Sequence, residues 1–306
     1  MPDARAWQRL ASRWPSRAQV FTYSLDVEGA PGCDPPEFME SLLLFAEHPA
    51  YLRENDAQRS LVLSHAWLAY NQKQVELEQS VVAPACLALL SGELPGASDL
   101  FARMVVSETL TDESFHVLMI EEASALTRKR RDLRPLALPA CHPVAEMQRE
   151  LARHAEPWER ALVLFATAIV SEVFVCSYLR RLAESSDIQP SNAHVTRAHL
   201  VDELGHGHIF RALARSAYGA MTVVQRAFFV GVLPRAIAWF TAIDAAPWPA
   251  ILEHVGLPNR RALLGDCAGH VEPTVNFTTL FKLCDELDIE DVRARVDELV
   301  GRWPAA

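Results

Sequence analysis

Two copies of the pattern Asp-Glu-x-x-His constrain this chain more than any other feature of its sequence. The copies are Asp112–His116 and Asp202–His206, and no other Glu-x-x-His occurs in the 306 residues. On an α-helix, residues three apart lie on the same face, so each copy directs a carboxylate and an imidazole to one point. One copy would be a weak signal, because such patterns also occur on solvated surfaces. Two copies indicate a metal site shared by facing helices.

A further acidic residue lies inside a segment that is otherwise almost entirely apolar. Residues 161–178 read ALVLFATAIVSEVFVCSY, and Glu172 interrupts the run. A helix that is apolar on all sides is buried, and an unpaired carboxylate is very costly in such surroundings. We therefore expect Glu172 to be protonated, paired with a positively charged group or bound to a metal.

Carboxylate-bridged di-iron sites use Glu-x-x-His from two bundle helices and a single glutamate from each of the other two. The fourth helix must then supply one glutamate, and Glu76 and Glu78 are the candidates. The helical neighbours of Glu78 form a core-facing stripe, whereas those of Glu76 are polar, so the periodicity favours Glu78 and leaves Glu76 solvated. His199 lies four residues before Glu203 on the same helix face, which makes it a seventh candidate ligand.

The rest of the chain predicts helices and no strand, within a single domain of residues 1–306. Residues 1–35 read as an irregular arm. Helices are expected at about 36–47, 58–90, 97–130, 144–154, 157–184 and 191–218, the last with Ser191 as its N-cap. Residues 58–218 would form the metal-binding bundle. Residues 219–306, interrupted by prolines such as Pro234, would supply accessory helices.

Composition excludes several classes of protein. The formal charge of −10 argues against a general nucleic-acid binder. Six cysteines without any CxxC spacing indicate reduced thiols. There is no secretory signal at the N-terminus, and the most apolar stretches, 81–90 and 161–170, are too short to cross a bilayer. We expect a cytoplasmic protein that binds neither nucleic acid nor a membrane.

The full pattern resembles the p-aminobenzoate N-oxygenase (AurF-like) family of non-haem di-iron oxygenases. The pattern consists of Glu78, Glu113, His116, Glu172, His199, Glu203 and His206. The third histidine distinguishes it from plain ferritin-like sites, which have only the two Glu-x-x-His pairs. The resemblance covers about residues 5–220 and includes the segment Leu10–Ala18. It implies an all-α fold, with a ferritin-like four-helix bundle core and additional C-terminal helices.

The resemblance also implies roles for these side chains. It gives two bridging carboxylates (Glu113 and Glu203), a pair that completes one metal (Glu78 and His116) and three residues that complete the other (Glu172, His199 and His206). Asp112 and Asp202 would each accept a hydrogen bond from a ligand histidine on a neighbouring helix, unless they are ordinary surface aspartates. Imidazoles and carboxylates without a thiolate suit iron, or alternatively manganese, better than structural zinc.

The activity implied by the family is that of a monooxygenase. Two irons would use O2 to oxygenate the nitrogen of a primary amine, to the hydroxylamine, nitroso or nitro level, in small-molecule biosynthesis. The sequence contains no flavin or nicotinamide fingerprint, so an external reductase or ferredoxin would supply electrons. The substrate would be a small-molecule amine or a carrier-bound aminoacyl group. The family suggests a homodimer, with the apolar segment Phe228–Phe240 either at the interface or in the core.

Three further residues are candidates for substrate binding. Tyr70 and Lys73 precede Glu78 on one helix, and Tyr178 follows Glu172. In the family this region approaches a substrate carboxylate, so they would anchor an anion, although an ordinary aromatic and a solvated lysine explain them equally well. Two other functions share the ligand set. One is a di-iron C–H hydroxylase or oxidase, and the other is a ferritin-like iron-handling protein.

Overall fold

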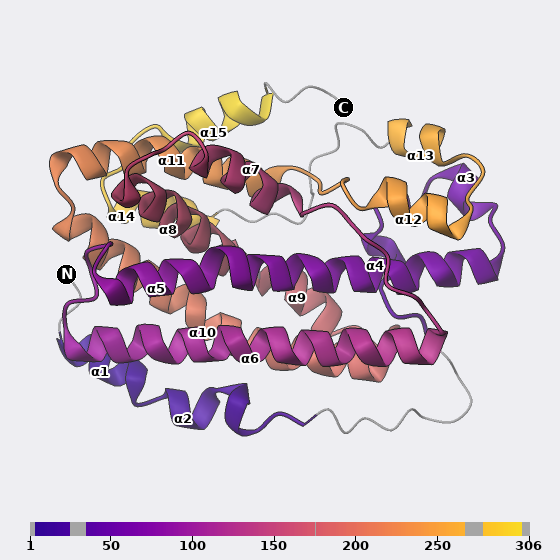
Figure 1. The fold of residues 1–306 in the computed structure, drawn as a ribbon, viewed down its shortest axis with the longest axis horizontal. Helices are drawn as coiled ribbons and strands as arrows, with labels where there is room; N and C mark the ends of the chain where they lie inside the picture. Colours follow the sequence, from indigo (N-terminus) through magenta and orange to yellow (C-terminus); the bar gives the residue numbers. More distant parts are fainter. Residues whose placement is uncertain (1–3, 25–34, 175, 267–277, 302–306) are drawn as a thin grey trace.

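The structure is a computed structural model that describes residues 4–24, 35–174, 176–266 and 278–301. All regular elements in these ranges are helices (Figure 1). They are α1 (Ala4–Ala11), α2 (Trp14–Arg17), α3 (Pro49–Leu52), α4 (Asp56–Leu77), α5 (Ala83–Ser91), α6 (Leu100–Arg131), α7 (His142–Leu151), α8 (Pro157–Phe174), α9 (Cys176–Ala183), α10 (Pro190–Ala220), α11 (Val223–Thr241), α12 (Trp248–Val255), α13 (Arg260–Asp266), α14 (Thr278–Glu286) and α15 (Val292–Gly301). Three short turns complete the set: two 3₁₀ turns, Gln19–Phe21 and Glu40–Leu42, and a π-helical turn, Glu78–Val82.

The long helices expected from the sequence are present and pack as a bundle. α4 continues through the π-helical turn into α5, and this combined helix lies beside α6 (Figure 1). α10 packs on both α6 and α8, and α5 also contacts α8, which closes the four-helix arrangement. α11 covers α8, while α12 packs on α4. The fold is an all-α bundle core with additional C-terminal helices, as the sequence predicted.

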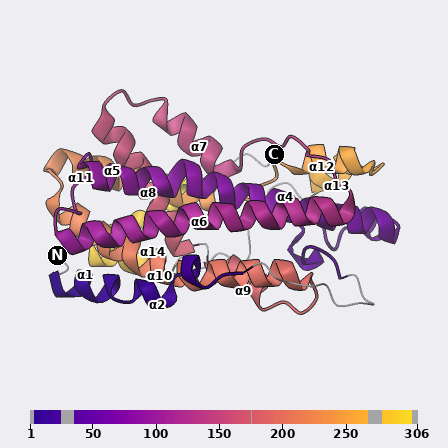
Figure 2. The same cartoon turned by 60° about the horizontal axis from the view of Figure 1, so that its bottom comes forward.

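The expectation of an irregular N-terminal arm is wrong for residues 4–21, which are largely helical. Figure 2 shows α1 and α2 running alongside the bundle near α6 and α10. The buried side chains Trp7, Ala11 and Ala18 hold this segment on the bundle. The apolar residues Trp7, Leu10 and Ala11 of α1 follow the i, i+3, i+4 spacing of a helix, so this element was detectable from the sequence.

Three other local expectations are also wrong. Residues 36–47 form only a 3₁₀ turn, because Phe38 and Phe45 are buried by an extended chain whose Glu37 accepts a hydrogen bond from Arg131. The N-cap of α10 is Gln189, and Ser191 lies inside the helix. Pro234 does not break α11, which runs through it.

A π-helical turn interrupts the α4–α5 helix at the candidate ligand Glu78. Within it, the Ala83 N–H donates to the Glu78 carbonyl five residues earlier. Pro84 follows directly, and a proline has no N–H and would collide with the carbonyl four residues before it in a regular α-helix. The wider turn accommodates this proline. Such single π turns occur frequently at functional sites.

Two apolar clusters occupy the two ends of the bundle. One includes Val81–Leu89 on the α5 side together with much of α8 and α11, and the other includes Val62–Trp67 on the α4 side together with α12. The candidate metal ligands lie between these clusters along α4, α6 and α10. The interior is therefore built as two apolar cores separated by a buried polar layer.

Two helical stretches, 157–183 and 223–241, are long and apolar enough by composition to cross a membrane. The first is longer than the sequence analysis allowed, but most of α8 is buried inside the bundle, as expected for a core helix. In α11, most of the segment Phe228–Phe240 is also buried. Of the two interpretations of that segment, the structure supports the core. Four cysteines are described and unbridged, whereas Cys33, Cys267 and His270 lie outside the described residues.

The N-terminal arm crosses α10 at a glycine inside the second Asp-Glu-x-x-His copy. The Arg17 guanidinium donates a hydrogen bond to the Asp202 carbonyl at 3.1 Å, and a Cβ built at Gly205 would overlap Arg17 Nη1. A side chain at this position would force the guanidinium off the helix. Gly231, inside α11, has no atom within 4 Å of the equivalent Cβ position.

These two glycines provide a matched test of the arm contact. Alanine in a helix interior is more favourable than glycine by about 0.5–1 kcal/mol, so Gly231→Ala should raise the free energy of unfolding by that amount. Gly205→Ala should show little or no gain, because the displaced Arg17 loses its contacts. Urea denaturation of both variants measures the difference. Equal stabilisation would show that the arm does not rest on Gly205.

Candidate metal centre

The structure brings all seven candidate ligands into one buried cluster. They come from four helical segments: Glu78 from the π-helical turn, Glu113 and His116 from α6, Glu172 from α8, and His199, Glu203 and His206 from α10. Each of the seven residues is at most 4% exposed. Three overlapping groups among them could each hold a metal ion, since their ligand atoms lie within 4.8 Å of one another.

Two glutamates occupy the centre of the cluster. Glu203 Oε1 lies 3.2 Å from His199 Nε2 and 3.3 Å from the Nδ1 atoms of both His116 and His206. The two oxygens of Glu113 face different histidines: Oε2 lies 3.1 Å from His116 Nδ1 and Oε1 lies 3.0 Å from His206 Nδ1. Glu113 and Glu203 thus each contact both His116 and His206, as carboxylates that bridge two metals would.

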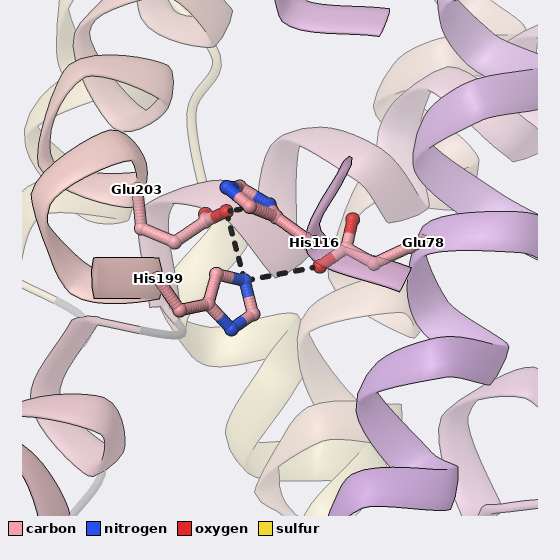
Figure 3. Close-up of side chains that lie close together, drawn as sticks. All are labelled: Glu78, His116, His199 and Glu203. Carbon is pink, nitrogen blue, oxygen red and sulfur yellow. Dashed lines mark ion pairs between the residues drawn. The ribbon is translucent and has the colours of Figure 1, made fainter. Parts of the chain in front are cut away.

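His199 lies beside Glu78 and His116, whereas the resemblance implies that it shares a metal with Glu172 and His206. Its Nε2 atom lies 3.4 Å from Glu78 Oε1, and these two residues form one group with His116 and Glu203 (Figure 3). Glu172 instead lies near His206, with 3.6 Å between Glu172 Oε2 and His206 Nδ1. The resemblance pairs His199 with Glu172 and His206, whereas the carboxylate oxygens within 3.4 Å of His199 Nε2 belong to Glu203 and Glu78. Glu172 forms a further group with Glu78 and Glu113.

The aspartate of each Asp-Glu-x-x-His copy contacts the histidine of the other copy. His116 Nε2 lies 3.2 Å from Asp202 Oδ2, and His206 Nε2 lies 3.1 Å from Asp112 Oδ2. A carboxylate at the distal nitrogen holds that N–H and leaves Nδ1 free to face the cluster. These are the contacts that the sequence led us to expect between neighbouring helices.

The N-terminal arm completes this layer with residues that the sequence analysis did not single out. Trp14 Nε1 donates to both oxygens of Asp112, at 2.8 and 3.0 Å, and Arg17 Nη2 lies 3.8 Å from the same carboxylate. The backbone N–H of Gln19 donates to Asp202 at 3.2 Å. The only signal for these contacts was the resemblance of Leu10–Ala18 to the family.

The cluster has more negative charge than its own side chains can balance. Burial raises the pKa of Glu78 well above its usual value, and the neighbouring Glu113 raises it further. Burial likewise raises the pKa of Glu172, and the charge of Glu203 adds to this effect. Without a cation these carboxyls retain protons, whereas a bound divalent metal would allow them to ionise.

Unpaired buried atoms provide the test of whether a metal fits this site. Seven buried atoms of the cluster make no hydrogen bond: Glu78 Oε2, Glu113 Oε1, Glu172 Oε2, His199 Nε2, Glu203 Oε1, Glu203 Oε2 and His206 Nδ1. Native proteins rarely leave buried polar atoms unpaired, because each one carries a desolvation cost. All seven are lone-pair donors of the kind that bind iron, manganese or zinc. The residues present therefore fit a metal centre.

A cavity of about 160 Å³ lies beside the cluster and is lined by the three candidate substrate residues, Tyr70, Lys73 and Tyr178. Tyr70 and Tyr178 stack with their ring centroids 5.4 Å apart, and burial raises the pKa of Tyr70 well above its usual value. Most of the remaining wall is apolar, including Phe38 and Trp248. The mainly apolar wall with a few polar groups is typical of a small-molecule site.

Lys73 shares the cavity wall with two carboxylates, Asp244 and Glu76. Its ammonium lies 3.7 Å from Asp244 Oδ2, so it is already ion-paired. Glu76 also lines the cavity and accepts hydrogen bonds from the Cys141 N–H and from Gln72, both at 2.7 Å. The expectation that Glu76 is a solvated side chain is therefore wrong. Asp244 was not detectable as its partner, because it lies 171 residues away from Lys73 in the sequence.

Comparison with known proteins supports the same assignment. A protein family described as "P-aminobenzoate N-oxygenase AurF" matches residues 4–288 of the chain. The chain is also 31% identical over 290 residues to the 4-aminobenzoate N-oxygenase of Streptomyces thioluteus, and the alignment covers 92% of this chain and 86% of that protein. The similarity therefore extends past the bundle, through the accessory helices α11 to α14.

The Asp–His contacts predict a loss of metal affinity when either aspartate is neutralised. Asp112→Asn and Asp202→Asn remove the charge that orients His206 and His116, and we expect divalent-metal affinity to fall about 10–100-fold. Competition with a chromophoric chelator measures the change. Asp297→Asn, at an exposed position of α15, is the control for the loss of one negative charge. Unchanged affinity in both variants would show that the aspartates do not act on the metal.

Proposed function

Because the chain belongs to the p-aminobenzoate N-oxygenase (AurF) family, we propose that it is a di-iron monooxygenase that oxygenates the nitrogen of a primary amine. The observation that carries this proposal is the set of unpaired donor atoms around Glu113 and Glu203. They lie between two histidines that aspartates hold in a single orientation. This arrangement supports two metals that share both glutamates.

The proposed ligand set divides the seven residues by their distances. Glu78, His116 and His199 would complete one metal, and Glu172 and His206 the other, with Glu113 and Glu203 shared. Iron is the metal we propose, with manganese as the alternative, because the donors are imidazoles and carboxylates. When bound, the metal pair supplies the activation of O2 and the transfer of oxygen to the amine.

The protein's own residues would orient the amine and keep water out. Leu77 and Ser171 line the cavity and directly precede Glu78 and Glu172 in the sequence, and we propose that the amine nitrogen is held at this end of the cavity. The stacked Tyr70 and Tyr178 supply a flat apolar wall suited to an organic substrate. Restricting the substrate to one orientation is the chief contribution of such a site.

Other properties belong to the same proposal. An external reductase or ferredoxin would return electrons to the metal pair, and the product would be a hydroxylamine, nitroso or nitro compound in small-molecule biosynthesis. The substrate would be a free amine or a carrier-bound aminoacyl group. We further propose that the enzyme works in the cytoplasm as a homodimer, in which Phe228–Phe240 is core and not interface.

Loss of one ligand should remove metal without unfolding the bundle. Glu172→Ala and His199→Ala each delete a donor, so the iron content should fall below two per chain while the far-ultraviolet circular dichroism stays unchanged. Glu76→Ala, two residues before Glu78 but outside the cluster, is the control and should retain iron. Two irons per chain in either ligand variant would contradict the seven-residue assignment.

The reaction itself is tested by supplying O2 to the reduced, iron-loaded protein with a panel of aromatic and aliphatic amines. We expect substrate-dependent O2 consumption and products oxygenated at nitrogen, identified by mass spectrometry. Oxygenation of carbon with the nitrogen untouched would favour the C–H hydroxylase alternative. O2 consumption that does not depend on any organic substrate would favour an iron-handling protein.

A further inference from the structure

We propose that the cavity beside the metal centre selects amines whose end opposite the reacting nitrogen is uncharged or cationic, and that it rejects carboxylates there. The inference rests on the proposed function, because it takes this cavity as the place where the amine binds. It differs from what the name of the 31%-identical relative, a 4-aminobenzoate N-oxygenase, would suggest for this chain.

The one lysine that lines the cavity lies away from the metal cluster. Lys73 precedes Glu78 by five residues, which is about 7.5 Å along a helix. The side chain of Lys73 is 34% exposed, whereas that of Glu78 is 6% exposed. Lys73 therefore lies toward the solvent side of the cavity. A substrate with its nitrogen at the cluster would present its far end to Lys73 and the residues around it.

The groups at this far end have an excess of negative charge. Lys73 is paired with Asp244, and Glu76 adds a second carboxylate. The start of α7 points its Cys141 and His142 N–H groups at Glu76 and Asp244, respectively. A helix N-terminus offsets only about half of one negative charge. No positive charge is left over for a substrate carboxylate.

The surroundings do not supply the missing cation. Burial lowers the pKa of His142, which keeps it neutral, and Arg149 is paired with Glu146 at 2.5 Å. Within the described parts of the chain, Lys73 is the sole basic residue that lines the cavity. Among the residues that the structure does not describe (1–3, 25–34, 175, 267–277 and 302–306), Arg302 is the one lysine or arginine.

One carboxylate oxygen of the cavity wall has no hydrogen-bond partner. Asp244 Oδ1 is buried and makes no hydrogen bond, although Oδ2 accepts from the His142 N–H at 3.2 Å. A buried carboxylate oxygen without a partner is costly, and an amide or amidinium N–H would satisfy it. A carboxylate in the same place would face Asp244 and Glu76 and would be repelled by both.

Three compounds with the same ring test this selection: 4-aminobenzoate, 4-aminobenzamide and 4-aminobenzamidine. Their dissociation constants are measured by calorimetry with the reduced, iron-loaded protein under anaerobic conditions, where no turnover occurs. We expect 4-aminobenzamide and 4-aminobenzamidine to bind at least about tenfold more tightly than 4-aminobenzoate.

Two variants assign the preference to these carboxylates. Asp244→Asn frees Lys73 and should tighten 4-aminobenzoate binding about tenfold while weakening that of 4-aminobenzamidine. Glu76→Gln should shift both affinities in the same directions without releasing Lys73, and it serves if Asp244→Asn unfolds. Asp297→Asn, exposed on α15, removes one charge elsewhere and should change neither ratio. A carboxylate bound directly to iron would not respond to Asp244→Asn.

The inference and the proposed function can fail separately. Tightest binding of 4-aminobenzoate to the unaltered protein, equal binding of all three compounds, or binding of none would overturn the inference. So would equal affinity ratios in Asp244→Asn and Asp297→Asn. If O2 is then admitted and no amine is oxygenated, the proposed function fails, while the order of binding still decides the charge preference.

Discussion

Mutual repulsion among four buried carboxylates is the constraint on which the rest of this structure depends. Glu78, Glu113, Glu172 and Glu203 come from four helical segments and share one layer between two apolar cores. Folding brings them together only if protons or cations balance their charge. The histidines are held with one nitrogen toward this layer by aspartates, and the arm holds the aspartates. Two divalent metals would cancel the four charges, so part of the formal charge of −10 belongs to the interior.

The composition of the cluster was predictable because each ligand leaves a local trace in the sequence. The three-residue spacing of Glu-x-x-His fixes two residues on one helix face, and a glutamate in an apolar run must have a buried partner. Helical periodicity also separated Glu78 from Glu76. The neighbours of His199 were not predictable, because they depend on how α10 is rotated against α4, which no local pattern records.

Contacts between distant segments account for what the sequence did not predict. Trp14 and Arg17 belong to α2, a helix of four residues that is too short to show a periodicity, and their partner Asp112 lies far away in the sequence. The contact of Lys73 with Asp244 joins α4 to the segment after α11. Lys73 in isolation predicts an anion site, whereas its ion pair with Asp244 is the basis of the charge preference that we propose. The net charge that a cavity presents to a ligand depends on all the charged groups that tertiary structure brings together there.

α4 and the π-helical turn that follows it contribute residues both to the cavity and to the metal cluster. Residues up to Leu77 are in α-helical register, and the π-helical turn that begins at Glu78 inserts one extra residue before α5. One residue corresponds to a rotation of about 100° around the helix axis. The face that lines the cavity before the turn therefore does not continue as the same face in α5, and within the turn Val81 and Val82 belong to the apolar core. The extra residue of this turn thus sets the orientation of the cavity wall relative to the core beyond the metal site.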